Sequence, residues 1–531
     1  MPLGRIGDYK EIPASIQDAG KCKSNFVIII IIESLNMNSK IVAARYSPRL
    51  RRVVNTASIL LLCIFFASCT SKAVKRKDTI GQSVRDGDFI GAVNDIKKNA
   101  RLYGETNAFL FNMDIGVLYH YAGMHDSSNV YLQRAADIYD ELFTRSVTNE
   151  AAAILTNDNV RPYRAKPFEL VLLHQFAALN FMAAGRANDA LVEVRRAQIH
   201  FNEWERTRGN TDKYHSDGMF HLIASLAYEA AGEVDNSLIS LYKAIAAYNM
   251  GPVRLPPDLR DFAARRLKAG GREGDLLRLD LTADSDAPEW GARMGASEIV
   301  IIGYAGKGPN LREQNWSGHY VKDGLLTIQT PGIDGRPRIV TIDAPMLPRS
   351  EYEKASRGEA TKSGTTFYIK LSLPQIQTFN SQTAYFTAYL TDDEDSDDAG
   401  SVLVNDIDKQ LQKALDDAWG ATLARTAIRV VLRTITAEKA KGRMQTSNPL
   451  LNLATNLSTD VASSQLERAD VRTCFILPQT MHMIRIPVDP GTHSVTLNVH
   501  NTTGRVIGKK EFNNIEVKRG EKKVLIHQSL R

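Results

Sequence analysis

The densest group of potential metal ligands in the sequence is an acidic run at residues 392–398, Asp-Asp-Glu-Asp-Ser-Asp-Asp. Its alternate aspartates match the first positions of a calcium-binding loop: Asp393, Asp395 and Asp397. A calcium-binding loop needs glycine at its sixth position, for the sharp turn, and a bidentate Glu at its twelfth. This sequence has Asp398 and Val404 at those two positions, so the match fails. We therefore interpret the run as a solvated loop before the next helix, because carboxylates are favoured at a helix N-terminus. No metal site and no cofactor is predicted.

Histidines and short motifs give no catalytic constellation. The sequence lacks His-Glu-x-x-His, Gly-x-Ser-x-Gly and the phosphate-binding Gly-x-x-x-x-Gly-Lys-Ser/Thr. His120 and His125 are close in the sequence, but a spacing of five does not suit one helix face. His493 and His500 occupy odd and even positions of a predicted strand and would point to opposite faces. We interpret these histidines as structural or surface residues.

Two groups of charged residues on predicted helices are the remaining candidates for a catalytic or anion-binding site. Asp416 and Asp417 could serve a glycan-cleaving enzyme, but adjacent helical residues diverge by about 100°. A stripe at Arg425, Arg429 and Arg433 could bind a carboxylate or an anionic lipid head, although a solvated helix face is favoured. No catalytic residue is predicted, and we expect the protein not to be an enzyme.

One cysteine follows an export signal. Residues 49–52 (Arg-Leu-Arg-Arg) precede the apolar run VVNTASILLLCIFFAS at 53–68, which is too short and one-sided for a membrane-spanning helix. The run ends in Phe66-Ala67-Ser68-Cys69, which resembles the lipobox of bacterial lipoproteins with Phe66 where Leu is usual. The resemblance implies cleavage before Cys69 and palmitate on its sulfur, so that several acyl chains hold the protein on a bilayer. An uncleaved anchor or a buried helix is the alternative.

The export signal also changes how charge and cysteines are interpreted. Residues 1–68 contain nine of the 66 Lys and Arg and four of the 60 Asp and Glu, so the remaining chain is nearly neutral. No nucleic-acid partner is therefore expected. Cys474 would be alone beside the acylated Cys69, which excludes an intrachain disulfide, and its predicted strand suggests a buried, inert thiol. We expect residues 1–36, before Met37, to be an over-called start or an extension.

From about residue 83 to 249 the sequence is helical and repetitive. Three copies each place an alanine twelve residues after a glycine, with an aromatic residue before the glycine. The pattern resembles a tetratricopeptide repeat at these positions: Gly116, Tyr119, Gly123 and Ala135; Phe181, Gly185, Ala190 and Ala197; Tyr228, Gly232 and Ala244. Small residues let antiparallel helices approach, and glycine permits the tight turn between them. The uneven spacing of the copies predicts insertions at 146–166 and 202–217, and a generic helical bundle is the alternative.

Beyond residue 296 the hydrophobic period changes to two, which predicts strands. The predicted strands include Ser297–Tyr304, Leu325–Gln329, Arg338–Ile342, Thr365–Leu373, Thr383–Leu390 and Val471–Ile476. Apolar residues at every fourth position predict helix at 402–418, and an apolar face at 424–439 continues it.

The predicted fold class is multidomain α+β, with a tetratricopeptide-like α-solenoid followed by a mixed α/β region and a C-terminal antiparallel β module. The expected division of the chain is an over-called start and signal peptide (1–68), a tether (69–82), helical repeats (83–270), a β-rich region (296–400), a helical segment (401–445) and the β module (465–531).

These features together resemble a largely uncharacterised family of bacterial lipoproteins with N-terminal tetratricopeptide-like repeats. The likeness rests on the lipobox, the irregular repeats, Glu298-Ile299-Val300-Ile301-Ile302-Gly303 with Gly308-Pro309, and Ala469-Asp470-Val471-Arg472 leading to Leu477-Pro478. It implies a place in the cell envelope, on the outer membrane facing the periplasm, and a link to peptidoglycan synthesis or envelope assembly.

The expected function is a non-enzymatic scaffold, tied to the membrane through Cys69, whose repeats offer a concave surface to another envelope protein. A subunit of a secretion or surface-appendage complex is the first alternative, and a glycan-acting enzyme is the second. The sequence leaves the identity of the partner and the oligomeric state open.

Overall fold

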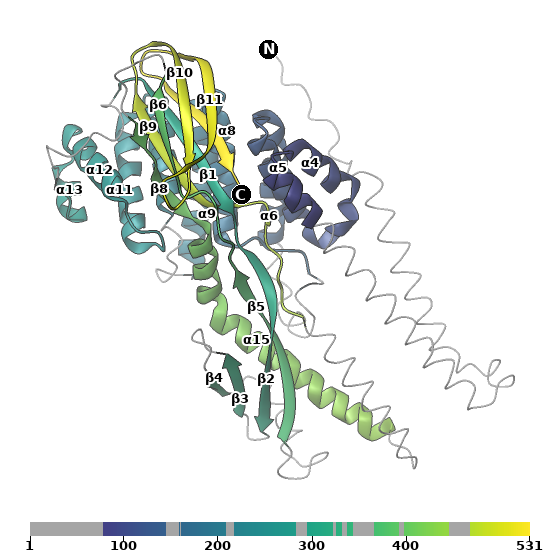
Figure 1. Ribbon diagram of the computed structural model, residues 1–531. Helices are drawn as coiled ribbons and strands as arrows, with labels where there is room; N and C mark the ends of the chain where they lie inside the picture. The colour runs from purple at the N-terminus through teal and green to yellow at the C-terminus, as the bar shows by residue number, and fades with distance from the viewer. Residues whose placement is uncertain are drawn as a thin grey trace, which may run out of the picture.

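The chain folds as an α+β protein in which helices cover one face of a pair of stacked sheets (Figure 1). The computed structural model describes residues 78–144, 159, 161–208, 217–282, 295–321, 325–331, 337–343, 366–391, 398–444 and 468–531. Cys69, the rest of the signal sequence and residues 392–397 of the acidic run lie outside the described residues.

The helical layer is built from consecutive helices joined by short turns. It begins with a helix at 78–85 and continues with α4 (Phe89–Lys98), η1 (Ala100–Leu102), η2 (Glu105–Asn107), α5 (Ala108–Tyr121), α6 (His125–Thr144), α8 (Pro167–Ala183), α9 (Ala187–Arg208), α10 (Gly218–Ala230), α11 (Val234–Met250), α12 (Pro257–Ala269) and α13 (Glu273–Leu279). Helices α5 and α6, α8 and α9, and α10 and α11 pack as hairpins. The expected tether is shorter than predicted, because residues 78–82 already belong to the first helix.

The first sheet lies against the helices and has the order β12-β1-β9-β8. Its strands are β12 (Lys522–Ser529), β1 (Glu298–Lys307), β9 (Pro478–Pro487) and β8 (Val402–Asp406). Strand β1 pairs in parallel with β12 and antiparallel with β9. Val300 and Ile302 of β1 face the helices, whereas Ile299 and Ile301 face the second sheet. The continuous apolar run of β1 follows from this burial on both faces.

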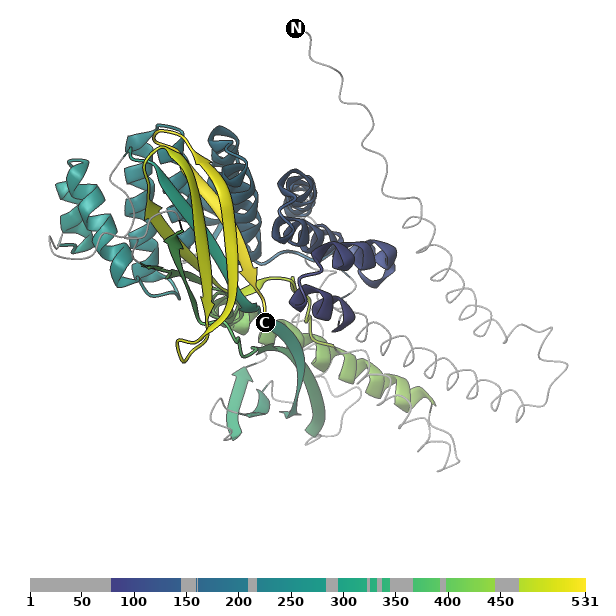
Figure 2. The same ribbon diagram turned by 45° about the horizontal axis from the view of Figure 1, so that its top comes forward.

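The second sheet covers the other face of the first and has the order β11-β10-β6-β7. Its strands are β11 (Val506–Val517), β10 (Gly491–His500), β6 (Tyr385–Leu390) and β7 (Ala399–Gly400), and Figure 2 shows the yellow C-terminal strands of this outer layer. Gly303 of β1 permits the close approach of the two sheets, since a Cβ there would lie 2.7 Å from the Phe386 ring. Both stacked sheets mix strands from 296–400 with strands from 465–531, so the C-terminal strands do not form a sheet of their own.

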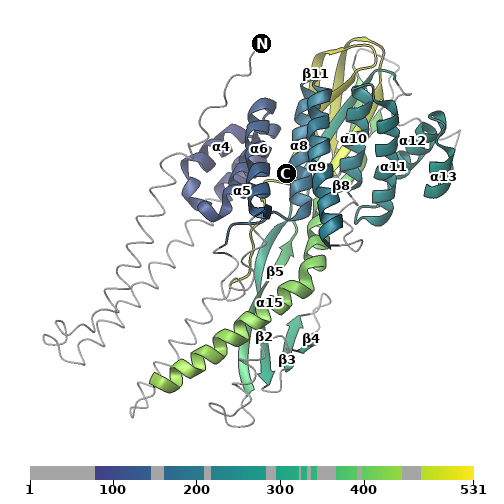
Figure 3. The ribbon, with the colours of Figure 1, turned by 180° about the vertical axis from the view of Figure 1, so that it is seen from behind.

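A third sheet and a long helix form an arm that projects from this body (Figures 1 and 3). The sheet has the order β4-β3-β2-β5, and its strands are β4 (Pro337–Asp343), β3 (Leu325–Pro331), β2 (Asn310–Val321) and β5 (Thr366–Gln377). Helix α15 (Ile407–Met444) contacts β5 and, with 38 residues, is about 57 Å long. One prediction was wrong here: residues 402–406, at the start of the predicted helical segment, form strand β8 rather than helix.

Candidate functional site

The glycines predicted to turn the helical hairpins occupy those turns. Gly123, Gly185 and Gly232 have φ angles of 70°, 70° and 79°, in the left-handed region that favours glycine. At each turn an amide N–H beyond the glycine bonds back into the first helix; that of Met124, for example, donates to the Tyr119 carbonyl at 2.9 Å. This local hydrogen bonding is a common helix C-terminal motif, so the sequence pattern located three helix–helix turns.

The small residues of the pattern lie where paired helices cross. A Cβ on Gly116 of α5 would lie 2.7 Å from a methyl group of Leu132 in α6. The alanines of the pattern are fully or almost fully buried: Ala135, Ala190, Ala197 and Ala244. The aromatic residues are partly buried against the same core: Tyr119, Phe181 and Tyr228. The pattern residues therefore stabilise hairpins. Two of them also accept hydrogen bonds from side chains: the Gly116 carbonyl from the Ser128 hydroxyl at 2.7 Å and the Tyr119 hydroxyl from Lys97 at 2.8 Å.

The inner helices α5, α8 and α10 are covered by the protein's own sheets. Helices α5 and α8 contact β12, and α10 contacts β8 (Figure 3). The Tyr121 hydroxyl donates to the carbonyl of Ile476 at 3.2 Å, and Gln528 of β12 donates to the carbonyl of Tyr121 at 2.8 Å. The inner face of the hairpins is therefore covered by strands and loops of this same chain.

A buried hydrogen-bond network joins α5, α8 and β1. The His120 ring lies between Asn180 of α8, 2.7 Å from Nδ1, and the Tyr304 hydroxyl of β1, 2.8 Å from Nε2. An amide oxygen only accepts, so Nδ1 donates to Asn180 and Nε2 accepts from Tyr304. Burial lowers the pKa of His120 to about 3, so the ring is neutral. His125 also donates to the Asn180 oxygen, at 2.8 Å, so the two histidines meet through a shared partner.

Five charged side chains form an ion cluster between the helices and the first sheet: Glu229 of α10, Arg266 of α12, Glu298 of β1, Arg485 of β9 and Lys522 of β12. Arg485 donates to both oxygens of Glu298, at 2.8 and 2.6 Å, while Lys522 lies 3.1 Å from Glu229 and 3.3 Å from Glu298. Burial alone would raise the pKa of Glu229, but the three cations outweigh it and hold that pKa below its usual value. This cluster was not predicted from the sequence, because its members lie far apart in the chain.

Cys474 is buried as expected, but the residues around it form no strand. Its thiol donates to Asp114 at 2.8 Å, and the neighbouring Thr473 hydroxyl donates to Glu169 at 2.9 Å. The backbone N–H of Cys474 also donates to Glu169, at 3.2 Å. These side chains replace a neighbouring strand as hydrogen-bond partners, which explains why the predicted strand Val471–Ile476 was wrong. Burial raises the pKa of the Cys474 thiol well above its usual value, and the nearby Asp114 raises it further.

The outer helices α6, α9 and α11 expose apolar side chains to solvent. We call this surface the outer face; its exposed apolar residues are Val130, Val192, Ile199, Val234, Ile239 and Met250. Ile199 is 63% exposed and Val192 50% exposed, and their spacing of seven residues places them on one side of α9. Ion pairs bridge neighbouring helices across this layer, including Arg196 with Asp137 and Arg195 with Glu233, each at 3.5 Å.

The charged candidates on α15 do not converge. Asp416 accepts from Gln412 at 2.9 Å, and Asp417 forms an ion pair with Lys413 at 2.8 Å, so each carboxylate has a partner one helical turn away. Arg425 is exposed, but Arg429 is 1% exposed, so the prediction of a solvated arginine face was wrong at that position. The side chain of Arg433 lies outside the described residues.

Within the described residues, no group of three or more His, Cys, Asp or Glu side chains is arranged to hold a metal ion. None of the helices in this part of the chain combines the length and apolar content that a membrane-spanning segment needs. No known protein-family model, curated protein or solved structure matches the chain.

Proposed function

We propose that this protein is a lipid-anchored, non-enzymatic scaffold of the bacterial outer membrane that binds another envelope protein. The anchor is the acylated Cys69 that the lipobox-like Phe66-Ala67-Ser68-Cys69 implies. The hairpins are tetratricopeptide-like units whose inner helices carry the chain's own sheets and whose outer helices meet the partner. A place in peptidoglycan synthesis or envelope assembly rests on the family resemblance alone.

The exposed apolar stripe on the outer face is the observation that carries this proposal. Val192 and Ile199 of α9 are exposed to solvent, whereas most apolar side chains of the inner helices are buried. Exposed apolar residues with a polar rim are typical of protein–protein interfaces. The outer helices are held in place by their buried contacts with the inner helices, and the ion pairs of Arg195 and Arg196 lie across their exposed side, so the surface is formed before binding.

The experiment is affinity purification of the tagged full-length chain from detergent-solubilised membranes. We expect one stoichiometric partner, reduced at least tenfold by Val192→Glu combined with Ile199→Glu. Val506→Glu combined with Ile507→Glu is the matched control, because these residues are 48% and 41% exposed on strand β11. Equal recovery from both double variants would exclude the outer face, and muropeptide turnover without a partner would favour an enzyme.

The arm favours the second candidate, a subunit of a secretion or surface-appendage complex. Helix α15 and the third sheet extend away from the body, where they are placed to reach a neighbouring subunit (Figure 1). Crosslinking of the full-length chain in membranes separates the two functions. A regular ladder of chain multimers supports the complex subunit, and a single heteromeric product supports the scaffold.

A further inference from the structure

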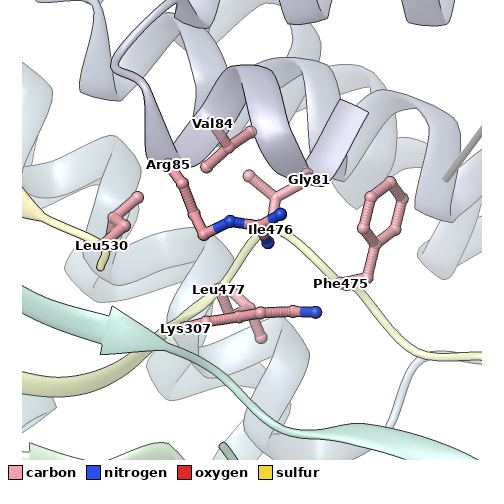
Figure 4. A pocket seen from close by; sticks show the side chains of 8 residues that line it. All are labelled: Gly81, Val84, Arg85, Lys307, Phe475, Ile476, Leu477 and Leu530. Atoms are coloured by element: carbon pink, nitrogen blue, oxygen red, sulfur yellow. The ribbon is translucent and has the colours of Figure 1, made fainter. Parts of the chain in front are cut away.

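A small pocket lies where four distant parts of the chain meet (Figure 4). It is lined by Gly81, Val84 and Arg85 of the helix at 78–85, Lys307 at the end of β1, Phe475, Ile476 and Leu477 of the segment before β9, and Leu530 next to the C-terminus. The empty space is about 280 Å³ and includes the open mouth. This pocket is separate from both the ion cluster and the outer face.

The floor of the pocket is apolar. Val84, Ile476, Leu477 and Leu530 are each at most 8% exposed, so they form a dry surface beneath the opening. The backbone N–H of Gly308, directly after Lys307, donates to the carbonyl of Leu477 at 2.8 Å and fixes β1 against this segment. The floor is therefore held by main-chain contacts and keeps its shape without a ligand.

Two cations share this pocket. Figure 4 shows the Arg85 guanidinium extending from its helix toward Ile476, with Lys307 running beneath it beside Leu477. Burial lowers the pKa of Lys307, and the charge of Arg85 lowers it further, whereas Asp78 acts in the opposite direction. Lys307 contacts the Phe379 ring, 3.8 Å from Nζ to the centroid, and Arg85 donates to the neutral side chain of Gln82 at 2.6 Å. Neither cation forms an ion pair within the described residues, and none of the lining residues is acidic.

We propose that this pocket binds an anionic amphiphile. Its phosphate or carboxylate group lies between Arg85 and Lys307, where a negative charge relieves the repulsion between the two cations. The first part of its apolar chain lies on Ile476 and Leu477, because an apolar floor gains by excluding water. Because the empty space of about 280 Å³ includes open solvent, the acidic group lies at the mouth, and only the start of the chain reaches the apolar floor.

The test uses the full-length chain in nanodiscs of phosphatidylcholine and short, water-soluble probes. Octyl phosphate represents a lipid headgroup with a chain, octanoate represents a free fatty acid, and octanol and inorganic phosphate each supply only one half of the proposed ligand. Binding is measured by calorimetric titration, with empty nanodiscs subtracted. We expect at least one anionic probe to bind ten times or more tighter than octanol and inorganic phosphate. The tighter of the two anionic probes identifies the source of the acidic group.

Two variants test the pocket itself. Arg85→Gln combined with Lys307→Gln is expected to weaken binding of the anionic probe at least tenfold, whereas Lys509→Gln combined with Lys510→Gln on β11 leaves it unchanged. Gly81→Leu fills the pocket from a helical position with no neighbour closer than the Arg85 guanidinium at 3.7 Å, so it blocks binding while favouring the helix. Octanol binding as tightly as the anionic probes, or wild-type affinity in both pocket variants, would overturn the proposal.

Discussion

Nε2 of His120 lies 2.8 Å from the hydroxyl oxygen of Tyr304, and this buried hydrogen bond joins helix α5 to strand β1 across 184 residues of sequence. It ties a hairpin of the helical layer to the central sheet, next to the amide of Asn180. The same contact determines how this junction responds to pH, because only the neutral ring can accept a hydrogen bond from Tyr304 while donating one to Asn180.

We predict that His120 makes the protein less stable in mild acid. The folded pKa is about 3 and the ordinary value is 6.5, so the unfolded chain binds a proton first as pH falls below 6.5. This one group then lowers the free energy of unfolding by about 2 kcal/mol between pH 6.5 and 5. Urea unfolding at pH 7 and pH 5 should show a smaller acid loss in His120→Gln than in the wild type. An identical acid loss in both proteins would contradict the assignment.

Removing one member of the ion cluster should destabilise the fold strongly. Glu298 is fully buried, so Glu298→Ala leaves Arg485 without its bidentate partner and leaves Glu229 as the remaining carboxylate for both Arg485 and Lys522. Breaking a buried pair in this way costs about 3–5 kcal/mol, and denaturant unfolding measures it. Asp417→Ala, which removes the more exposed pair with Lys413, is the control and should change stability by less than about 1 kcal/mol. Similar losses in the two variants would show that the cluster is not the stabilising element.

The crossing of α5 and α6 should be sensitive to a single methyl group. Gly116→Ala places a Cβ 2.7 Å from the fully buried Leu132, and overpacking of this kind costs about 1–3 kcal/mol. Gly420→Ala in α15 is the matched control, because no atom lies within 4 Å of its Cβ and alanine favours a helix by up to about 1 kcal/mol. Thermal unfolding should therefore shift in opposite directions in the two variants, and a stabilising Gly116→Ala would refute the close crossing.

Acylation at Cys69 predicts a specific labelling pattern. Cells fed an alkyne-bearing fatty acid should label the wild type and Cys63→Ala, whereas Cys69→Ala should lose the label and leave the membrane fraction. Cys63 is the matched control because it lies inside the apolar run that precedes Cys69. Equal labelling of Cys69→Ala and wild type would place the acyl chains on another residue.

The local features of the fold were predictable from short stretches of sequence. The turns at Gly123, Gly185 and Gly232 were found because a left-handed backbone selects glycine, and the alanine twelve residues later marks a helix crossing. The apolar run of β1 was identified as a strand for a similar reason, since burial on both faces leaves a continuous signal. By contrast, Leu403 extended the apolar spacing of four from the helix into residues 402–406, which form strand β8.

The sequence by itself determined the helix–turn–helix units and the central strand, because each depends on residues that are neighbours in the chain. Tertiary structure alone decided that β1 lies between β12 and β9, that the inner helix face is covered, and that Glu229, Glu298 and Lys522 meet. It also decided that the segment at Cys474 bonds to Asp114 and Glu169 rather than to a strand. These outcomes depend on contacts between residues that are far apart in the chain. The order of residue types along the chain does not show which distant segments come together.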